Sequence, residues 1–149
     1  MAAKPAPTTA RLVSTLGGRR ALRSHVGSTD ELRERLRRGL PFAAVTALGA
    51  AYRIDVKRLA AILSIPERTF ARRRHERRLR ADESDRLVRV ARIAALAEGA
   101  LGGKERAIHW LHRPNRALGL AAPLSLLDTE IGARQVEDVL GRIAHGVYS

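Results

Sequence analysis

Signals that begin and end helices recur along this chain, and no segment alternates apolar and polar residues as a strand would. Ser28 and Glu31 form a capping-box pattern ahead of leucines at helical spacing, and Gly39 offers a stop. Residues 41–52 are apolar and rich in alanine, which favours a buried helix. The helices expected from such patterns span 29–38, 41–52, 56–63, 66–78, 82–98, 104–111, 123–127 and 132–145. The sequence therefore predicts an all-α fold.

Two of these helices, 56–63 and 66–78, are separated by a short turn and match the plan of a helix-turn-helix. Ser64 occupies the turn, where glycine is more usual, and Pro66 suits the first position of the second helix. The residues expected to face the core in this motif are Leu59, Ala60, Leu63, Ile65 and Phe70. Arg73 departs from the pattern, because it lies three residues after Phe70, where an apolar residue often sits.

The positive charge of the chain is concentrated in its first 80 residues. Residues 1–28 hold five basic and no acidic side chains, residues 29–80 hold fourteen and six, and residues 81–149 hold nine of each. Such segregation indicates that one face meets a polyanion while another has a different role. We therefore divide the chain into a basic flexible arm at 1–28, a helix-turn-helix DNA-binding domain at 29–103 and a C-terminal domain at 104–149.

The second helix of the motif is expected to lie in the major groove of double-stranded DNA, with its first residues nearest the base edges. Arginine can bind O6 and N7 of guanine together, and the expected base-reading residues are Arg68, Thr69 and Arg72. The residues expected at phosphates are Lys57, Arg58, Arg73, Arg74, Arg77 and Arg78. The alternative is that the arginines between 73 and 78 form a solvated face and pair with the acids at 76, 82 and 85.

Several classes of function find no support in the sequence. Without cysteine the chain has neither disulfides nor thiolate metal sites, and His109 and His112 lack further ligands, so we expect no metal. The nucleophile-elbow, phosphate-loop and dinucleotide motifs are absent, so we expect neither a cofactor nor an enzyme. No apolar run approaches the roughly 20 residues that span a bilayer, and the N-terminus lacks the apolar stretch of a secretory signal, so we expect a cytoplasmic protein.

Residues 104–149, within the electrically neutral back half at 81–149, need a separate explanation. Their apolar residues are expected to form the core of a small helical module, and these are Trp110, Leu111, Leu118, Leu124 and Leu127. Yet a DNA-binding domain needs no such addition, and apolar residues without net charge suit a protein partner. Dimerisation is the simplest case, since helix-turn-helix proteins usually bind paired half-sites.

Motifs in both halves resemble the Xre/MbcA/ParS antitoxin family over about residues 40–149. The back-half motifs are WL at 110–111, PNRALG at 114–119, PLSLLDTEIG at 123–132 and HGVYS at 145–149. Upstream, RTFARR at 68–73 and ESDRL at 83–87 resemble the DNA-binding half of the same family. The resemblance implies a helix-turn-helix domain followed by a small helical toxin-binding domain, and it does not cover residues 1–39.

The resemblance further implies the antitoxin of a type II toxin–antitoxin system, whose partner is a RES-domain toxin that consumes NAD or transfers from it. The C-terminal module would block the NAD pocket of the toxin, and the helix-turn-helix would repress the promoter of the same operon, with a homodimer inside a larger complex. The toxin-binding residues implied are Trp110, Asn115, Leu118, Leu124, His145, Gly146, Val147, Tyr148 and Ser149. An alternative from another class is a stand-alone helix-turn-helix regulator whose C-terminal half dimerises or senses a ligand.

Overall fold

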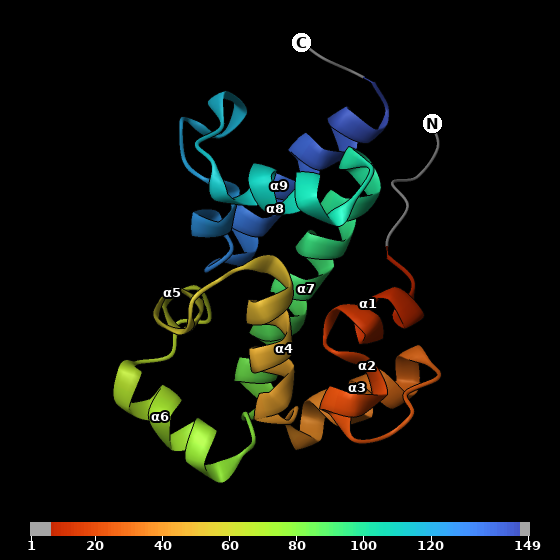
Figure 1. The fold of residues 1–149 in the computed structure, drawn as a ribbon, viewed down its shortest axis with the longest axis vertical. Coiled ribbons are helices and arrows are strands. Elements are labelled where there is room, and N and C mark those ends of the chain that lie inside the picture. Colours follow the sequence, from red (N-terminus) through yellow and green to blue (C-terminus); the bar gives the residue numbers. More distant parts are fainter. Residues whose placement is uncertain (1–6, 147–149) are drawn as a thin grey trace.

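A computed structural model describes residues 7–146 of the chain, and Figure 1 shows them as a bundle of helices around one long central helix. The described α-helices are α1 (Thr9–Thr15), α2 (Gly18–Leu22), α3 (Thr29–Arg38), α4 (Phe42–Tyr52), α5 (Val56–Ile62), α6 (Glu67–Glu76), α7 (Ala81–Leu101), α8 (Lys104–His112) and α9 (Glu130–Ala144). Two short 3-10 helices, η1 (Arg116–Leu118) and η2 (Pro123–Leu126), connect α8 to α9. The expected all-α fold is confirmed for the part of the chain that the structure describes.

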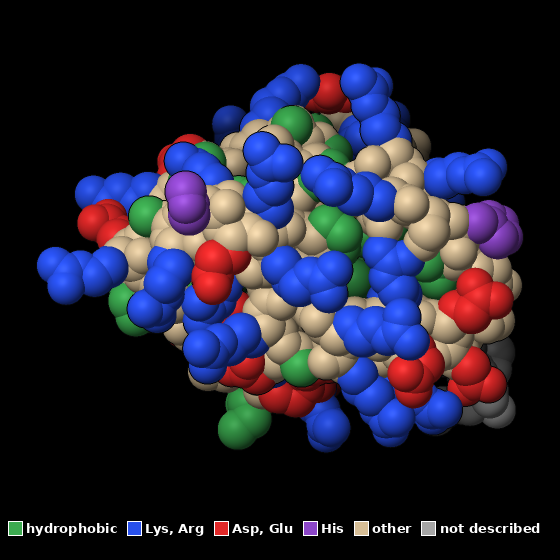
Figure 2. Space-filling model, turned by 90° about the horizontal axis from the view of Figure 1, so that it is seen from below, with side chains coloured by type: hydrophobic (Ala, Val, Ile, Leu, Met, Phe, Trp, Pro, Cys, Tyr) green, Lys and Arg blue, Asp and Glu red, His purple; other side chains and the backbone are tan. Residues whose placement is uncertain are grey.

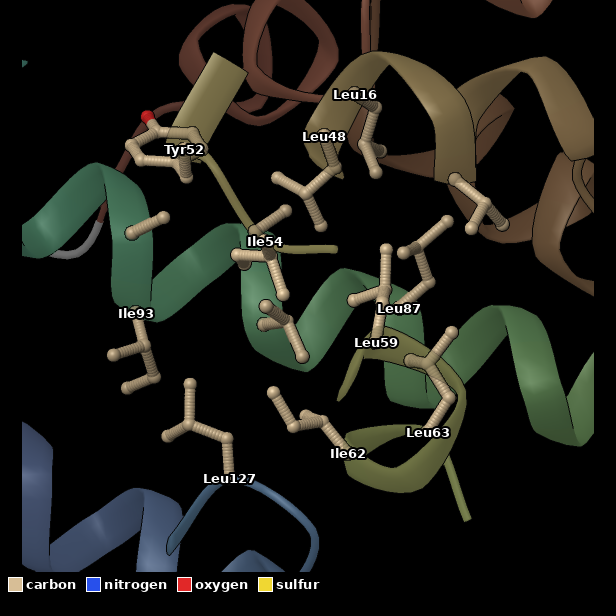
Figure 3. Close-up of a cluster of buried hydrophobic side chains, with 14 of the residues drawn as sticks. Leu16, Leu48, Tyr52, Ile54, Leu59, Ile62, Leu63, Leu87, Ile93 and Leu127 are labelled. Atoms are coloured by element: carbon tan, nitrogen blue, oxygen red, sulfur yellow. The ribbon is translucent and has the colours of Figure 1, made fainter. Parts of the chain in front are cut away.

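The long helix α7 joins the two halves of the molecule. It spans 21 residues, and its buried positions recur every three or four residues along most of its length. Helices α1, α3 and α4 pack against it on one side, while α8 and α9 surround its C-terminal half. Side chains from α4, α5, α7 and the segment before α9 meet in a single apolar cluster (Figure 3). The helix-turn-helix and the C-terminal helices therefore share one continuous core.

The N-terminal segment is folded from Thr9 onward, so the expectation of a flexible arm at 1–28 was wrong for its described part. The side chains of Leu16 and Leu22 are completely buried in the core. Between the two short helices, Gly17 has a φ of +97°, and a Cβ there would lie 2.4 Å from the Cβ of Ala21. Helices α1 and α2 have only seven and five residues, and the sequence around them, with its prolines and glycines, shows little helical period. Residues 1–6 lie outside the described residues.

Most expected helix boundaries are close to those observed, and the deviations have local causes. The helix predicted to reach residue 78 ends at Glu76, because Arg77 adopts a left-handed conformation with φ of 62°. The last helix begins earlier than expected, at Glu130, because the Thr129 hydroxyl accepts a hydrogen bond from the Gly132 amide at 2.9 Å. Within residues 7–146, no helix combines the length and the apolar character needed to cross a bilayer.

Candidate nucleic-acid interface and partner surface

The predicted helix-turn-helix is present as α5, a four-residue turn and α6. The Asp55 carboxylate caps α5 by accepting from the Arg58 amide at 2.8 Å. Ser64 has a positive φ of 55°, which explains why glycine is the more usual residue at this turn. The ring of Phe70 is buried and meets the edge of Phe42 with centroids 5.1 Å apart. These contacts fix the angle at which α6 leaves the core.

One face of α6 presents cations to solvent. Arg68 and Arg72 are exposed and Thr69 is half-buried, and no acidic side chain among the described residues pairs with either arginine. Arg74 is exposed as well, with its guanidinium carbon 5.6 Å from the centre of the Phe42 ring. Arg77, at the end of the helix, and Lys57, on α5, are also exposed. Figure 2 shows lysine and arginine side chains spread over the end of the molecule that carries α3 and α6.

The prediction that Arg73 contacts phosphate was wrong, because this side chain lies inside the protein. It is only 5% exposed, and its Nε donates to Glu83 Oε1 at 2.8 Å while Nη1 donates to Glu76 Oε1 at 3.1 Å. The hydrogen bond to Glu83 raises the pKa of Arg73 above its ordinary value, which outweighs the opposing effect of burial. Its position three residues after Phe70 places Arg73 on the inner face of α6, and Glu83 neutralises the charge that this position brings inside.

Two buried polar residues at the start of α7, Glu83 and Ser84, were not identified from the sequence. Glu83 Oε1 also accepts from the Arg80 amide at 2.8 Å, and thereby joins the last turn of α6 to the first turn of α7. The Ser84 hydroxyl accepts from the Leu40 amide at 2.8 Å and donates to the Arg80 carbonyl at 2.7 Å. In the sequence these residues resemble an ordinary acidic helix start. The signal that could have identified Glu83 was Arg73 at an apolar position of the motif, because an arginine buried there needs an acidic partner.

Arg58 also differs from its expected role, because its side chain is engaged within the chain. It is half-buried, and its Nη1 lies 3.1 Å from Nδ1 of His112 on α8. The other ring nitrogen of His112 lies 2.9 Å from the Tyr52 carbonyl oxygen. Since a guanidinium can only donate, we infer that His112 is the neutral tautomer that accepts at Nδ1 and donates from Nε2. Arg58 thus links α5 to the C-terminal half and points away from the outer face of α6.

The residues expected to contact a toxin have different surroundings. Leu124 is only 1% exposed and belongs to the shared core, so the prediction that it contacts a partner was wrong. Apolar residues on η2 are needed to close the core between α5, α8 and α9, which explains its burial. Trp110 is half-buried and lines an open groove of about 840 Å³ together with Arg53, His109 and Arg113.

The Asn115–Ala121 loop displays an apolar residue that sequence reasoning missed. Asn115 Oδ1 accepts from the Ala117 amide at 2.9 Å, and the Asn115 carbonyl accepts from the Leu120 amide at 2.9 Å. Leu118, between them, packs half-buried on the core, whereas Leu120 is 67% exposed with a φ of 69°. Leucine rarely adopts this left-handed conformation. Asn115 and Leu118 therefore shape the loop, and Leu120 is the side chain that it presents.

A second exposed apolar residue lies at the start of α9, where Ile131 is 76% exposed. At the other end of this helix, His145 and Gly146 are exposed as well. Val147, Tyr148 and Ser149 lie outside the described residues, so their expected role stays a prediction. Within residues 7–146 no group of three or more histidine or acidic side chains is placed to share a metal ion.

The chain matches two family models in succession. The antitoxin Xre-like helix-turn-helix domain matches residues 31–92, and the antitoxin Xre/MbcA/ParS C-terminal toxin-binding domain matches residues 96–146. The division between the two falls inside α7, before the glycines at which we placed a domain boundary.

Three curated relatives, each named antitoxin Xre, are similar to this chain. The protein from Photorhabdus laumondii is 36% identical over 116 residues, which cover 76% of this chain and 78% of the relative. The protein from Yersinia enterocolitica is 45% identical over 87 residues, and that from Pseudomonas putida is 41% identical over 83 residues. The matches cover 57% and 55% of this chain, which spans 59% of the Yersinia relative and 52% of the Pseudomonas relative.

Proposed function

Because the chain belongs to the Xre/MbcA/ParS antitoxin family, we propose that it is the antitoxin of a type II toxin–antitoxin system with two binding surfaces. The first is the cationic face of α6, which binds the promoter of its own operon. The second lies in the C-terminal domain, which binds and neutralises a toxin. The observation that carries the proposal is the exposed cationic face of α6, where Arg68 and Arg72 have no acidic partner within residues 7–146, in a chain whose following domain matches a toxin-binding model.

On the DNA side, α6 enters the major groove and represses transcription by occupying the promoter. Arg68, Thr69 and Arg72 lie in the first two turns of α6, where a recognition helix approaches base edges. Lys57, Arg74 and Arg77 lie around them and bind phosphates, which fixes the register without reading sequence. Arg73 takes no part in this contact, because its charge is satisfied by Glu83. Pairing of two half-sites requires a homodimer.

On the protein side, the partner is a RES-domain toxin that acts on NAD. The proposed contacts are the Trp110 groove, Leu120, Ile131 and the tail from His145 onward. A few residues contribute most of the binding energy in protein interfaces, and tryptophan and tyrosine are frequent among them, which favours Trp110 and Tyr148 as the main anchors. The tail would enter the NAD pocket of the toxin, where Tyr148 supplies a ring in place of a base of the dinucleotide. The antitoxin itself catalyses nothing in this scheme and requires no cofactor.

The toxin part is tested by expressing this chain together with a RES-domain toxin encoded beside it. We expect growth to be restored and the two proteins to purify as one complex. Deletion of residues 146–149 should weaken the protection, because it removes the tail from the pocket. Cells that remain poisoned by the toxin in the presence of the full chain would contradict the proposal. Promoter binding in that case would favour the stand-alone regulator.

The DNA part is tested on the promoter fragment upstream of the gene. Binding should weaken steeply as salt is added, because each arginine–phosphate contact releases a counterion. Three phosphate contacts from each subunit of the proposed homodimer, six in all, would give a slope of about −5 in a plot of log affinity against log salt concentration. A promoter affinity no higher than that for an unrelated duplex would contradict operon repression.

A further inference from the structure

The C-terminal end of α3 is fixed against the end of α6. Arg78 Nη1 donates to the Arg38 carbonyl at 3.2 Å, and the Leu79 amide donates to the Leu40 carbonyl at 2.9 Å. The two segments approach so closely that a Cβ on Gly39 would lie 1.9 Å from the Leu79 carbonyl oxygen. The exposed surfaces of α3 and α6 therefore form one continuous end of the molecule, which is the end seen in Figure 2.

Three arginines of α3 extend the cationic surface beyond α6. Arg33, Arg37 and Arg38 are exposed, and Arg38 has no acidic partner among the described residues. The other two pair with acids of their own helix, Arg33 with Asp30 and Arg37 with Glu34, both at 3.1 Å. Pairs as exposed as these contribute about 0–1 kcal/mol, so a phosphate can replace the acid at little cost.

Arg35, the remaining arginine of α3, has a different role. It donates hydrogen bonds to the Ser24 hydroxyl and the Leu22 carbonyl, and so attaches the end of α2 to α3. The orientation of α3 is thus set by contacts that do not involve the side chains of Arg33, Arg37 or Arg38. These three side chains can be changed without removing a contact that holds the helix in place.

We propose that Arg33, Arg37 and Arg38 form a second contact with the DNA backbone, beside the groove that α6 occupies. This inference rests on the proposed DNA binding by α6 and extends its footprint. The end of α3 adjoins the C-terminal end of α6, whereas the first turns of α6 are the ones that approach bases. The α3 arginines therefore meet phosphates and add affinity without adding sequence preference.

The test compares two triple variants that lose the same charge at opposite ends of the molecule. One is Arg33→Ala/Arg37→Ala/Arg38→Ala, on α3. The control is Arg116→Ala/Arg134→Ala/Arg142→Ala, whose exposed arginines lie on η1 and α9, at the other end of the bundle (Figure 1). Alanine preserves helix propensity in both. The probes are the promoter fragment and a duplex of mixed sequence of about 30 base pairs, or roughly three helical turns.

We expect the α3 variant to lose at least about tenfold in affinity for both probes, with a salt slope shallower by about 5 than that of the wild type, because three arginines are lost from each subunit of the proposed homodimer. The control should stay within about threefold and keep the wild-type slope, because its arginines are remote from the bound DNA. Thermal unfolding establishes that each variant is folded. If the α3 variant is not folded, the single change Arg38→Gln should still make the slope shallower by about 2, one contact in each subunit.

Two other outcomes distinguish a failure of the inference about α3 from a failure of the proposed DNA binding by α6. If the α3 variant and the control behave alike while wild-type protein binds the promoter, the inference about α3 is overturned and the role of α6 stands. If wild-type protein binds neither probe, the DNA-binding function proposed for α6 fails, and the inference fails with it.

Discussion

The arginines of α6 and those of α7 are similar in number but differ in what surrounds them. On α7, Arg86 pairs with Asp82 at 2.7 Å, Arg89 with Glu130 at 3.1 Å, and Arg92 with Glu137 at 3.0 Å. On the outer face of α6, Arg68 and Arg72 have no acidic partner among the described residues. The cations of α7 hold helices together, whereas those of α6 remain available to a polyanion. Ion pairing of the arginines therefore distinguishes α6 from α7, and a count of net charge does not show this difference.

Arg73 shows that the same division runs through α6 itself. Its neighbours Arg72 and Arg74 face solvent, while Arg73 is buried against Glu83 at the start of α7. In its surroundings Arg73 resembles the arginines of α7. The comparison predicts that adjacent arginines on one helix respond to mutation in opposite ways.

The largest effect is expected for Arg73→Ala. The change leaves the Glu83 carboxylate buried without its cation, and breaking a buried pair in this way typically costs about 3 kcal/mol. Denaturant unfolding measures the loss. Arg72→Ala is the matched control and should change the free energy of unfolding by less than about 0.5 kcal/mol. Equal stability of the two variants would mean that the burial of Arg73 does not hold α6 in place.

The next effect is on DNA affinity. Here we expect Arg72 to matter and Arg73 not to contact DNA, the reverse of their effects on stability. Arg72→Ala should weaken promoter binding by about 1–3 kcal/mol, roughly 5- to 150-fold, because it removes a contact in the groove. Arg92→Ala, on α7, removes an equal charge that is already paired with Glu137. We expect it to leave promoter affinity nearly unchanged in a gel-shift or fluorescence titration. Equal losses from both changes would show that overall charge, rather than pairing, governs binding.

Much of the fold could be predicted because its signals are local. The boundaries of α3 were predicted to the residue, since its Ser28 cap and its Gly39 stop lie within the helix and its immediate flanks. The turn of the helix-turn-helix was found for the same reason. In contrast, α1 and α2 were missed, because each is short and two glycines, the N-cap Gly17 and the first residue of α2, Gly18, interrupt the pattern.

The candidate site was harder to predict, because its contacts join distant residues. Arg58 and His112 are 54 positions apart, and nothing in either neighbourhood indicates the other. Apolar character also failed to distinguish buried from exposed residues: Leu124 and Leu120 lie four positions apart, and only the first is buried. Their different exposure depends on how the loop folds against α9, which no local pattern specifies.

A smaller effect is expected at Tyr52, which shares the carboxylate of one glutamate with the N-terminal residue Arg11. Arg11 donates to Glu98 at 2.9 Å, and the Tyr52 hydroxyl donates to the other oxygen of the same carboxylate at 2.9 Å. This arrangement connects α1, α4 and α7. Tyr52→Phe should lower the free energy of unfolding by about 1 kcal/mol at neutral pH, because it leaves one oxygen of Glu98 without its donor.

The same tyrosine predicts a dependence on alkaline pH. Burial and the hydrogen bond to Glu98 raise the pKa of Tyr52 above its ordinary value. The folded state therefore holds the hydroxyl proton more tightly than the unfolded state, and this stabilisation is complete below a pH of about 10, the ordinary pKa of tyrosine. It is lost as the pH rises further. Above that pH, the free energy of unfolding measured in denaturant should fall less with pH for Tyr52→Phe than for the wild type. Equal falls in the two proteins would contradict the assignment of this pH dependence to Tyr52.

The smallest effect is expected for Glu130→Gln, on the exposed start of α9. Glu130 pairs with Arg89, Arg92 and Arg134, but it is half exposed, so its loss should cost less than about 1 kcal/mol and should cost least at high salt. Thermal unfolding in low and high salt measures this loss. The control is Gln135→Glu, which changes the charge of the same helix by one unit in the opposite direction and removes no ion pair, because glutamine is uncharged.

The same variant separates two explanations of DNA binding. Glu130→Gln removes the acidic partner of Arg89, which then has no such partner within residues 7–146, as is the case for Arg72. If lack of a partner alone made a cation bind DNA, promoter affinity and its salt slope would both rise. We expect neither to change, because Arg89 lies on α7 against the start of α9 and is not part of α6. A steeper salt slope would show that promoter affinity depends more on the availability of unpaired cations than on the position of α6.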